Sequence, residues 1–445
     1  DSNAPLSLLN MSKEILVMVM GLLCEDLRYS KDEFDDLSFN VLLSSKALSD
    51  ALVEGEAVTV RMLQARGAIP MLPWSIRSNR QLLQGKRPSP QFRWSFSDHR
   101  GAVPTWSVRS YPLDGDTLTW VEDNTLVFTT ASEEIGLFRL FDGGMSYRQL
   151  QNAGSAFSTG TVSCVAPFPK KHKYAFVTCS KTHIVLWNEM GEFKQMVSIS
   201  HHFPLDRVVV SPLGDALITT SLDELRYVRV LPFLQAEEDM ITYKWSLAEM
   251  GRSVFVFWIG SEHVMVVSRE GRAIVLAVPT TKVRKFMQIE ELKIGDRVVS
   301  CTQMLNGDVV ALAEGCISQM EEASTRNVFV RFDASGDIGS ILRNATFNPL
   351  HLPYQARLVD LEPLSNDVVA CRLLNMNHHG TFEDSEEGEW GQPYIGTGAL
   401  HFYNAVSGEH LMRTEVASDS PFVYMRGGTS TLATFGRAGI DFVAY

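Results

Sequence analysis

The sequence predicts a mainly-β chain: a seven-bladed β-propeller preceded by a small α-helical unit. From residue 91 onward, short alternating strands rich in Val, Ile, Thr and Phe are separated by Gly-Asp and Gly-x turns. Comparable units start near 104, 160, 205, 252, 297, 355 and 418. Four short strands in every 40 to 50 residues or so are typical of propeller blades.

The two ends of the propeller region supply the third observation. The last unit has only three strands, "PFVYMRG", "TSTLATFG" and "AGIDFVAY", and a fourth is available in "QFRWSF" at 91–96. A strand from the far terminus would close the ring and remove two open sheet edges. A β-sandwich would not predict this arrangement. The spare strand therefore favours a closed ring that spans residues 91–445.

Composition permits a large packed core and excludes a generally basic surface. The chain has 445 residues, 45% of them hydrophobic and 21% charged, with a formal net charge of −12. The surface as a whole is therefore not expected to bind nucleic acid or anionic membranes. The six cysteines contain no CxxC pair, which favours reduced thiols and a cytoplasmic or nuclear protein.

The opening segment holds an apolar run from Ile15 to Cys24. It is shorter than the roughly 20 residues of a membrane span. A secretion signal fits the length, but Glu14 abuts the run and no small-x-small cleavage site follows. Ser12 can cap a helix whose first turn holds Glu14. The run therefore predicts a helix that is apolar on most sides and buried against a partner.

Two more helical patterns complete the N-terminal unit, which spans 1–65. Leu37, Val41, Leu48 and Leu52 fall at helical spacing before Gly55, and a short piece continues to Gly67. Residues 66–90 form a basic linker broken by four prolines. A helical unit of about 60 residues is only marginally stable alone. We expect it to share its core with another chain or with the propeller.

The helical unit resembles an F-box. "LNMSKEILVMVMGLL" is similar to the first F-box helix, and "VLLSSKALSDAL" is similar to a later F-box segment. Ser12 stands where the family usually has proline, Leu48 stands near its usual tryptophan, and "CEDLRYSKDEFD" is longer than the family's connection. The resemblance implies docking onto the Skp-type adaptor of a cullin ubiquitin ligase, through Leu9, Ile15, Leu16, Val19, Leu22 and Leu23. The alternative is that these helices cap the propeller.

The β units resemble WD-repeat blades. "THIVLWNEMGEF" (182–193) is similar to the strand that ends in Trp-Asp in that family, with Trp187-Asn188 here. "VVVSPLGDALITTSLD" is similar to the Ser-Pro-x-Gly stretch of the family. The resemblance implies that His202 and Asp223 match the His and Asp that bridge strands within a blade. Most units lack these residues, so it supports the architecture rather than a ligand.

No catalytic motif is present. The chain has no Walker loop and no HExxH, and Leu432 replaces the last glycine of a G-x-S-x-G pattern. His378, His379, Glu383 and Asp384 carry groups that bind divalent ions, but adjacent histidines in an acidic segment are more often plain surface. We therefore expect neither catalysis, nor a cofactor, nor a metal site.

Long connections on a rigid scaffold are where binding residues concentrate. Two such segments stand out, 313–327 and 375–390, and the second is either a solvated insertion or a site for a basic partner segment. Trp245 and Trp390 are expected in loops, where exposed tryptophans anchor partners, whereas Trp94, Trp106, Trp120 and Trp258 follow strand patterns and are expected in the core. The partner-binding candidates are His202, Asp223, Trp245, His378, Glu383 and Trp390.

A local basic cluster also lies within the propeller region. "PFPKKHKYAF" (167–176) holds Lys170, Lys171, His172 and Lys173 between two strands of one unit. An exposed turn is the simplest interpretation, and a phosphate or RNA contact is the alternative.

These observations combine into one functional hypothesis and two alternatives. The hypothesis is a non-catalytic substrate receptor of a cullin-type (SCF) ubiquitin ligase, with helices on a Skp-type adaptor and a protein substrate on the propeller loops. The main alternative is a scaffold in a multiprotein assembly, in a kinetochore, trafficking or RNA-processing complex, without a ubiquitin role. A propeller enzyme is third, and would need a cluster of titratable groups in the central channel.

Overall fold

The computed structural model describes a little over half of the chain, mostly within the propeller region. The described residues are 92–95, 118–122, 124–129, 135–141, 144–150, 162–170, 172–180, 183–198, 205–221, 224–229, 242–251, 254–280, 282–315, 327–336, 338–350, 356–364, 366–375, 399–415, 422–427, 431–436 and 439–444. The predicted helical unit (1–65) and basic linker (66–90) lie outside them. Within the described ranges, no helix is long and apolar enough to cross a membrane.

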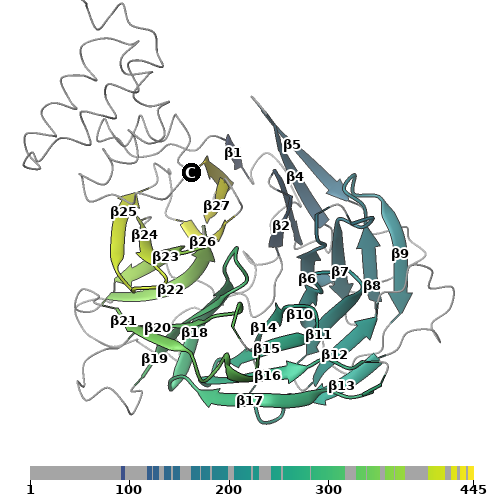
Figure 1. The fold of residues 1–445 in the computed structure, drawn as a ribbon. Coiled ribbons are helices and arrows are strands. Elements are labelled where there is room, and N and C mark those ends of the chain that lie inside the picture. The colour runs from purple at the N-terminus through teal and green to yellow at the C-terminus, as the bar shows by residue number, and fades with distance from the viewer. Residues whose placement is uncertain are drawn as a thin grey trace, which may run out of the picture.

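The described residues form seven four-stranded antiparallel sheets arranged around a common centre (Figure 1). In six sheets the spatial order of the strands is the order of the chain. The first strand of each sheet is the innermost one and contacts the neighbouring sheet. This is the up-and-down order of propeller blades, so the predicted β-propeller is confirmed.

The sheets are numbered here from the N-terminal side. Sheet 1 contains β2 (Leu118–Glu122), β3 (Thr125–Thr129), β4 (Ile135–Phe141) and β5 (Gly144–Leu150). Sheet 2 contains β6 (Val162–Pro167), β7 (Phe176–Ser180), β8 (His183–Trp187) and β9 (Phe193–Ser198). Sheet 3 contains β10 (Leu205–Val210), β11 (Ala216–Ser221), β12 (Glu224–Arg229) and β13 (Thr242–Ser246).

Sheets 4 to 6 continue the same pattern. Sheet 4 contains β14 (Val254–Ile259), β15 (His263–Ser268), β16 (Arg272–Ala277) and β17 (Met287–Lys293). Sheet 5 contains β18 (Arg297–Gln303), β19 (Val309–Glu314), β20 (Asn327–Phe332) and β21 (Thr346–Pro349), with the 3-10 helix η4 (Ile338–Ser340) before β21. Sheet 6 contains β22 (Ala356–Pro363), β23 (Val368–Asn375), β24 (Ala399–Asn404) and β25 (His410–Glu415).

Sheet 7 joins the two ends of the propeller region. It contains β26 (Phe422–Gly427), β27 (Thr431–Gly436) and β28 (Gly439–Ala444), and β1 (Phe92–Ser95) pairs with β28 as its fourth strand. The register pairs Phe92 with Phe442 and Trp94 with Ile440. The prediction that a strand from 91–96 completes the last sheet is confirmed.

The predicted unit starts agree with the first strands of six sheets to within a few residues. The first unit is the exception: it was expected near residue 104, and the first strand of sheet 1 is β2 at Leu118–Glu122. β2 is separated from β3 by only two residues and pairs with it from Leu118 opposite Phe128. A connection of two residues is enough to join antiparallel strands, so β2, and not the stretch near 104, is the strand that pairs with β3.

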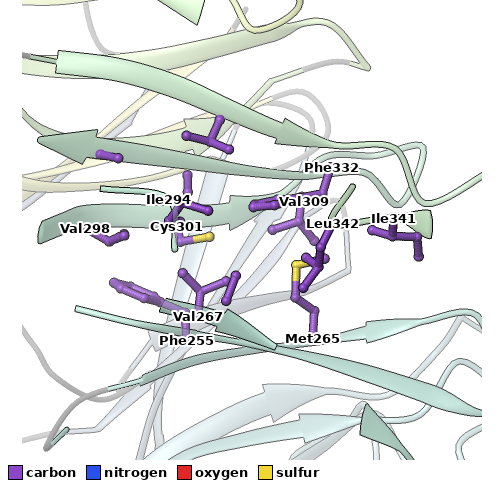
Figure 2. Close-up of a cluster of buried hydrophobic side chains, with 14 of the residues drawn as sticks. Phe255, Met265, Val267, Ile294, Val298, Cys301, Val309, Phe332, Ile341 and Leu342 are labelled. Atoms are coloured by element: carbon purple, nitrogen blue, oxygen red, sulfur yellow. The ribbon is translucent and has the colours of Figure 1, made fainter. Parts of the chain in front are cut away.

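The core lies between the faces of neighbouring sheets. Figure 2 shows the cluster between sheets 4 and 5, where Met265 and Val267 face Val309 and Phe332. Each of these four side chains is fully buried. Burying one such side chain contributes about 1.5–3 kcal/mol, so the interfaces hold the sheets at fixed angles and keep their connecting turns in place.

Candidate functional site

The strand order defines two faces of the ring. Consecutive strands run antiparallel, so every first strand ends on the face that also carries the connection between third and fourth strands. We call this the end face. The opposite face, where first strands begin, is the start face, and it carries the connections from second to third strands and from one sheet to the next.

Exposed large hydrophobic side chains gather on the connections of the end face. Five of the seven in the described part of the chain lie in such a connection or at the last residue of the strand before it: Phe141, Met190, Leu213, Leu305 and Val406. The other two, Met287 and Ile289, lie on β17 at the outer edge of sheet 4. Leu213 (67%) and Leu305 (56%) are the most exposed of all and follow innermost strands. Apolar side chains held in water mark interaction surfaces when they cluster.

Leu213 is held at the tip of a tightly bonded turn between β10 and β11. The buried Ser211 hydroxyl donates to Asp215 Oδ1 (2.7 Å) and accepts from the backbone N–H groups of Asp215 and Ala216 (3.1 Å each). Gly214 has a φ of +74°, which only glycine adopts without strain. The turn is therefore fixed by these hydrogen bonds, and Leu213 stands exposed at its tip.

Leu305 occupies a similar turn between β18 and β19. The Asp308 carboxylate, 2% exposed, accepts from Arg331 Nε (2.9 Å), Asn306 Nδ2 (2.9 Å) and the backbone N–H of Ala334 (2.9 Å). One buried carboxylate thus ties this turn to the connection after β20. Charge-assisted hydrogen bonds of this kind hold a loop more firmly than neutral ones.

A shorter connection separates the two leucine turns. In sheet 4, only Gly260, Ser261 and Glu262 join β14 to β15. A Cβ added at Gly260 would meet no atom within 4 Å, so there is open space beside this turn. Gln303 Nε2 donates to the carbonyl oxygens of Trp258 (2.8 Å) and Gly307 (2.9 Å), which fixes sheet 4 to the Leu305 turn.

The basic turn of sheet 2 lies next to the Leu213 turn. Lys170 and Lys173 are exposed, whereas the His172 ring stacks on Phe168 with ring centroids 4.7 Å apart. His172 Nδ1 accepts from the backbone N–H of Tyr174 (3.2 Å), and the ring packs over Gly214 of sheet 3. The interpretation of this segment as an exposed turn is confirmed for Lys170 and Lys173. His172 instead locks two neighbouring turns together.

Burial sets the charge of this turn. Desolvation lowers the pKa of His172 below its ordinary value, and the nearby Lys173 ammonium lowers it further, against raising contributions from a backbone hydrogen bond and Asp215. His172 is therefore neutral at neutral pH. The positive charge of the turn comes from its lysines, and Lys173 Nζ lies 4.5 Å from the centroid of the Tyr174 ring.

The buried charged groups with known partners in the described residues serve the fold. Arg226 pairs with Glu224, Asp308 pairs with Arg331, and Glu290 Oε2 accepts from the backbone N–H of Leu342 (2.9 Å). Desolvation raises the pKa of the Cys301 thiol far above neutrality, so it is no nucleophile. Among described residues, no three His, Cys, Asp or Glu side chains are grouped to hold a metal ion. The exposed turns of the end face are therefore suited to binding.

One of the sequence-predicted partner-binding residues falls in the described residues, and its predicted loop setting is wrong. Trp245 lies in β13 opposite Leu225, and its ring packs on the core cluster between sheets 3 and 4. Its β-strand pairing was missed because "ITYKWS" follows an acidic stretch that is typical of a loop. His202, Asp223, His378, Glu383 and Trp390 lie outside the described residues, as do the adaptor-docking candidates Leu9, Ile15, Leu16, Val19, Leu22 and Leu23.

The predicted core tryptophans and binding segments have mixed outcomes. Trp258 is buried and Trp120 is partly buried in the core, as predicted. The two long segments follow β19 and β23, which are both second strands, so both leave the ring on the start face. Their residues 316–326 and 376–398 lie outside the described residues. Leu213 and Leu305 were not among the predicted binding residues, although each shortly precedes a Gly-Asp turn that the sequence displays.

The WD-repeat resemblance has a counterpart in sheet 2. Trp187 Nε1, on the third strand, donates to Thr178 Oγ1 on the second strand at 2.9 Å, and both side chains are buried. This bond lies in the unit whose "THIVLWNEMGEF" stretch carries the resemblance.

Comparisons with solved structures support the fold. The chain is similar to the β-propeller domain of Cps50 (Swd1) from Myceliophteria thermophila, with 10% identity, a TM-score of 0.51, and coverage of 75% of this chain and 98% of that chain. It is also similar to a chain of the mitotic checkpoint complex, with 9% identity, a TM-score of 0.50, and coverage of 80% and 95%. No protein-family model and no curated protein sequence matches the chain. At these identities the likeness shows a WD-repeat-like β-propeller fold alone.

Proposed function

We propose that this chain is a non-catalytic, WD-repeat-like scaffold that binds protein partners in a multiprotein assembly. The observation that carries the proposal is the end face, where Leu213 and Leu305 stand exposed on turns fixed by buried hydrogen bonds. Rigid apolar side chains bind at a low entropic cost, because little is ordered on binding. The similarity to a chain of the mitotic checkpoint complex agrees with such a role.

The absence of known catalytic motifs from the sequence supports a binding role rather than an enzymatic one. The cysteine pattern supports a cytoplasmic or nuclear assembly. The ubiquitin-ligase role rests on the helical unit alone and stays a prediction, since no observation on the propeller favours it over the scaffold. We therefore give the scaffold first place.

The experiment compares the native size of the assembly for paired variants. The full chain, affinity-tagged and expressed in its source cells, is run by size exclusion with light scattering. We expect it to elute larger than a monomer, and Leu213→Asp with Leu305→Asp to shift it toward the monomer. Met287→Asp with Ile289→Asp is the matched control, because these exposed side chains lie on the outer strand β17. A monomeric wild-type chain, or equal loss in both pairs, would contradict the proposal.

A second experiment separates the scaffold from the ligase receptor. The chain is co-expressed with a Skp-type adaptor, as wild type and with Ile15→Asp or Leu22→Asp. Co-elution that both substitutions abolish would restore the ligase receptor. A propeller that assembles with partners through the end face, without the adaptor, supports the scaffold.

A further inference from the structure

We propose that the inner rim of the end face, from sheet 2 to sheet 5, binds an extended segment of a partner protein that carries apolar residues next to an acidic end. This inference rests on the proposed scaffold function and names the chemistry of its partner. The rim consists of the basic turn (168–170 and 172–175), the Leu213 turn (211–215), the short Gly260 turn (260–262) and the Leu305 turn (304–308).

The first step is the placement of the apolar contacts. Leu213 belongs to sheet 3 and Leu305 to sheet 5, and sheet 4 lies between them with its short turn and the open space beside Gly260. Both leucines follow innermost strands, so both stand close to the centre of the ring rather than at its periphery. A segment that crosses the sheet 4 turn can therefore contact both leucines. An extended chain spans such a row of turns at about 3.3 Å per residue.

The second step is the charge at one end of the row. The basic turn adjoins the Leu213 turn, because the His172 ring packs over Gly214. Lys170 and Lys173 are exposed on it. The whole chain carries a formal charge of −12, so an acidic segment is repelled by most of the surface. Among the inner turns, this basic turn then attracts the acidic end of such a segment, whereas the exposed Lys282, Arg284 and Lys285 of the end face lie on the outer β16–β17 connection of sheet 4.

The third step is that the two leucine turns and the basic turn are already held in place before a partner binds. Ser211 and Asp308 fix the leucine turns by buried hydrogen bonds, and the ring stack of Phe168 and His172 fixes the basic turn. Neutral His172 adds no charge of its own at neutral pH, so the attraction depends on the lysines. Asp215 and Glu262 are also exposed on this row, so among its four turns acidic residues are favoured at the sheet 2 end.

The test measures binding of short fluorescein-labelled peptides to the full chain by fluorescence anisotropy. One peptide carries an acidic block followed by spaced leucines, a second has lysines in place of the acids, and a third has serines in place of the leucines. We expect the first peptide to bind most tightly, and more weakly at high salt, because exposed charges are screened. Equal binding of the first two peptides would refute the charge assignment.

Paired variants locate the binding site. Lys170→Glu with Lys173→Glu should weaken binding of the acidic peptide about tenfold, because two exposed attractions become repulsions. Leu213→Ala and Leu305→Ala should each weaken it by roughly fivefold or more. Lys293→Glu and Met287→Ala are the controls, since both residues are exposed on β17, away from the rim. Losses in the controls equal to those in the rim variants would overturn the proposal.

Other occupants of the rim give distinct outcomes, and each overturns the inference. A concentration-dependent dimer that Leu213→Asp abolishes would identify a second copy of the chain. Cross-links from the rim to residues 1–90 would identify the N-terminal part of the same chain. If no peptide binds while the assembly still depends on Leu213 and Leu305, the partner chemistry fails and the scaffold stands. If the chain forms no assembly, the proposed function fails with it.

Discussion

Glycine at position 214 meets two separate requirements, and a pair of substitutions separates them. Its φ is +74°, and an added Cβ would lie 2.8 Å from His172 Cδ2. Gly260 has a φ of +62° but no atom within 4 Å of the added Cβ. Gly260→Ala should cost about 1 kcal/mol of unfolding free energy from backbone strain alone. Gly214→Ala should cost about 2–3 kcal/mol, because the His172 ring must also move.

Urea denaturation of both variants measures the difference. Equal losses of stability in the two variants would mean that the His172 ring yields easily, and that sheets 2 and 3 are not locked at this point.

Protonation of His172 gives a prediction about pH. Its pKa in the folded chain is lowered, mainly by desolvation, so the unfolded chain binds a proton first as the pH falls. Stability is then lost as the pH drops through the ordinary histidine pKa of about 6.5 and below. His172→Gln should reduce the loss of unfolding free energy between neutral and mildly acidic pH. Part of the dependence should remain, since burial also lowers the pKa values of His263 and His410. An unchanged pH slope in the variant would exclude His172 as a contributor.

The residue scale is also where sequence reasoning was weakest. The Gly214-Asp215 turn could be predicted, because glycine and aspartate favour turns locally. The exposure of Leu213 could not, because a leucine beside a turn has the same local pattern whether it points into a core or into water. For Trp245 the error was the opposite one. It was expected to be exposed because its surroundings in sequence are polar, but its ring packs on the core cluster of the neighbouring sheet.

At the scale of elements, Asp308 holds two connections of sheet 5 together. Asp308→Ala would leave Arg331 without its buried partner, and we expect a loss of about 3 kcal/mol of unfolding free energy. Asp333→Ala is the matched control, because this exposed carboxylate accepts local hydrogen bonds from Ser335 and Gly336 and only senses the Arg331 charge, and its loss should cost less than about 1 kcal/mol. Chemical denaturation measures both values, and a loss below about 1 kcal/mol for Asp308→Ala would show that the turn is held by other contacts.

Most strands could be predicted because each one satisfies a local rule: period-two alternation bounded by turn residues. The first strand of sheet 1 could not, since the stretch near 104 obeys the same rule and only pairing with β3 decides between them. The joining of the propeller ends was predicted for a different reason. The last sheet lacks a fourth strand, and the start of the propeller region has one strand to spare. A closed ring requires the two to pair, and β1 does pair with β28.

At the scale of the whole molecule, the two faces are a product of connectivity. The end face carries the leucine turns, and the start face carries the departures of the two long segments after β19 and β23. Sequence alone gave the segments and the turns separately. Only the antiparallel order of the strands shows that they serve opposite faces, which leaves room for two partners on one ring.

Closure of the ring gives the last prediction. A chain that starts at residue 91 keeps β1, whereas a chain that starts at residue 97 loses it and leaves β28 as an open edge. Ile440 and Phe442, fully buried beside β1 in sheet 7, would then lose cover on that side. We expect the shorter chain to unfold at a temperature lower by roughly 5 °C or more. It should also self-associate, because an unpaired strand edge is a template for pairing.

Thermal unfolding and light scattering on the two truncated chains measure these effects, and the difference between them isolates β1 from the residues before it. Equal unfolding midpoints would mean that the interfaces between neighbouring sheets hold the ring together without β1, the fourth strand of sheet 7. In that case the end-face turns would keep their geometry, and partner binding would survive the loss of closure. A lower midpoint with lost binding would instead show that the rim depends on the ring as a unit.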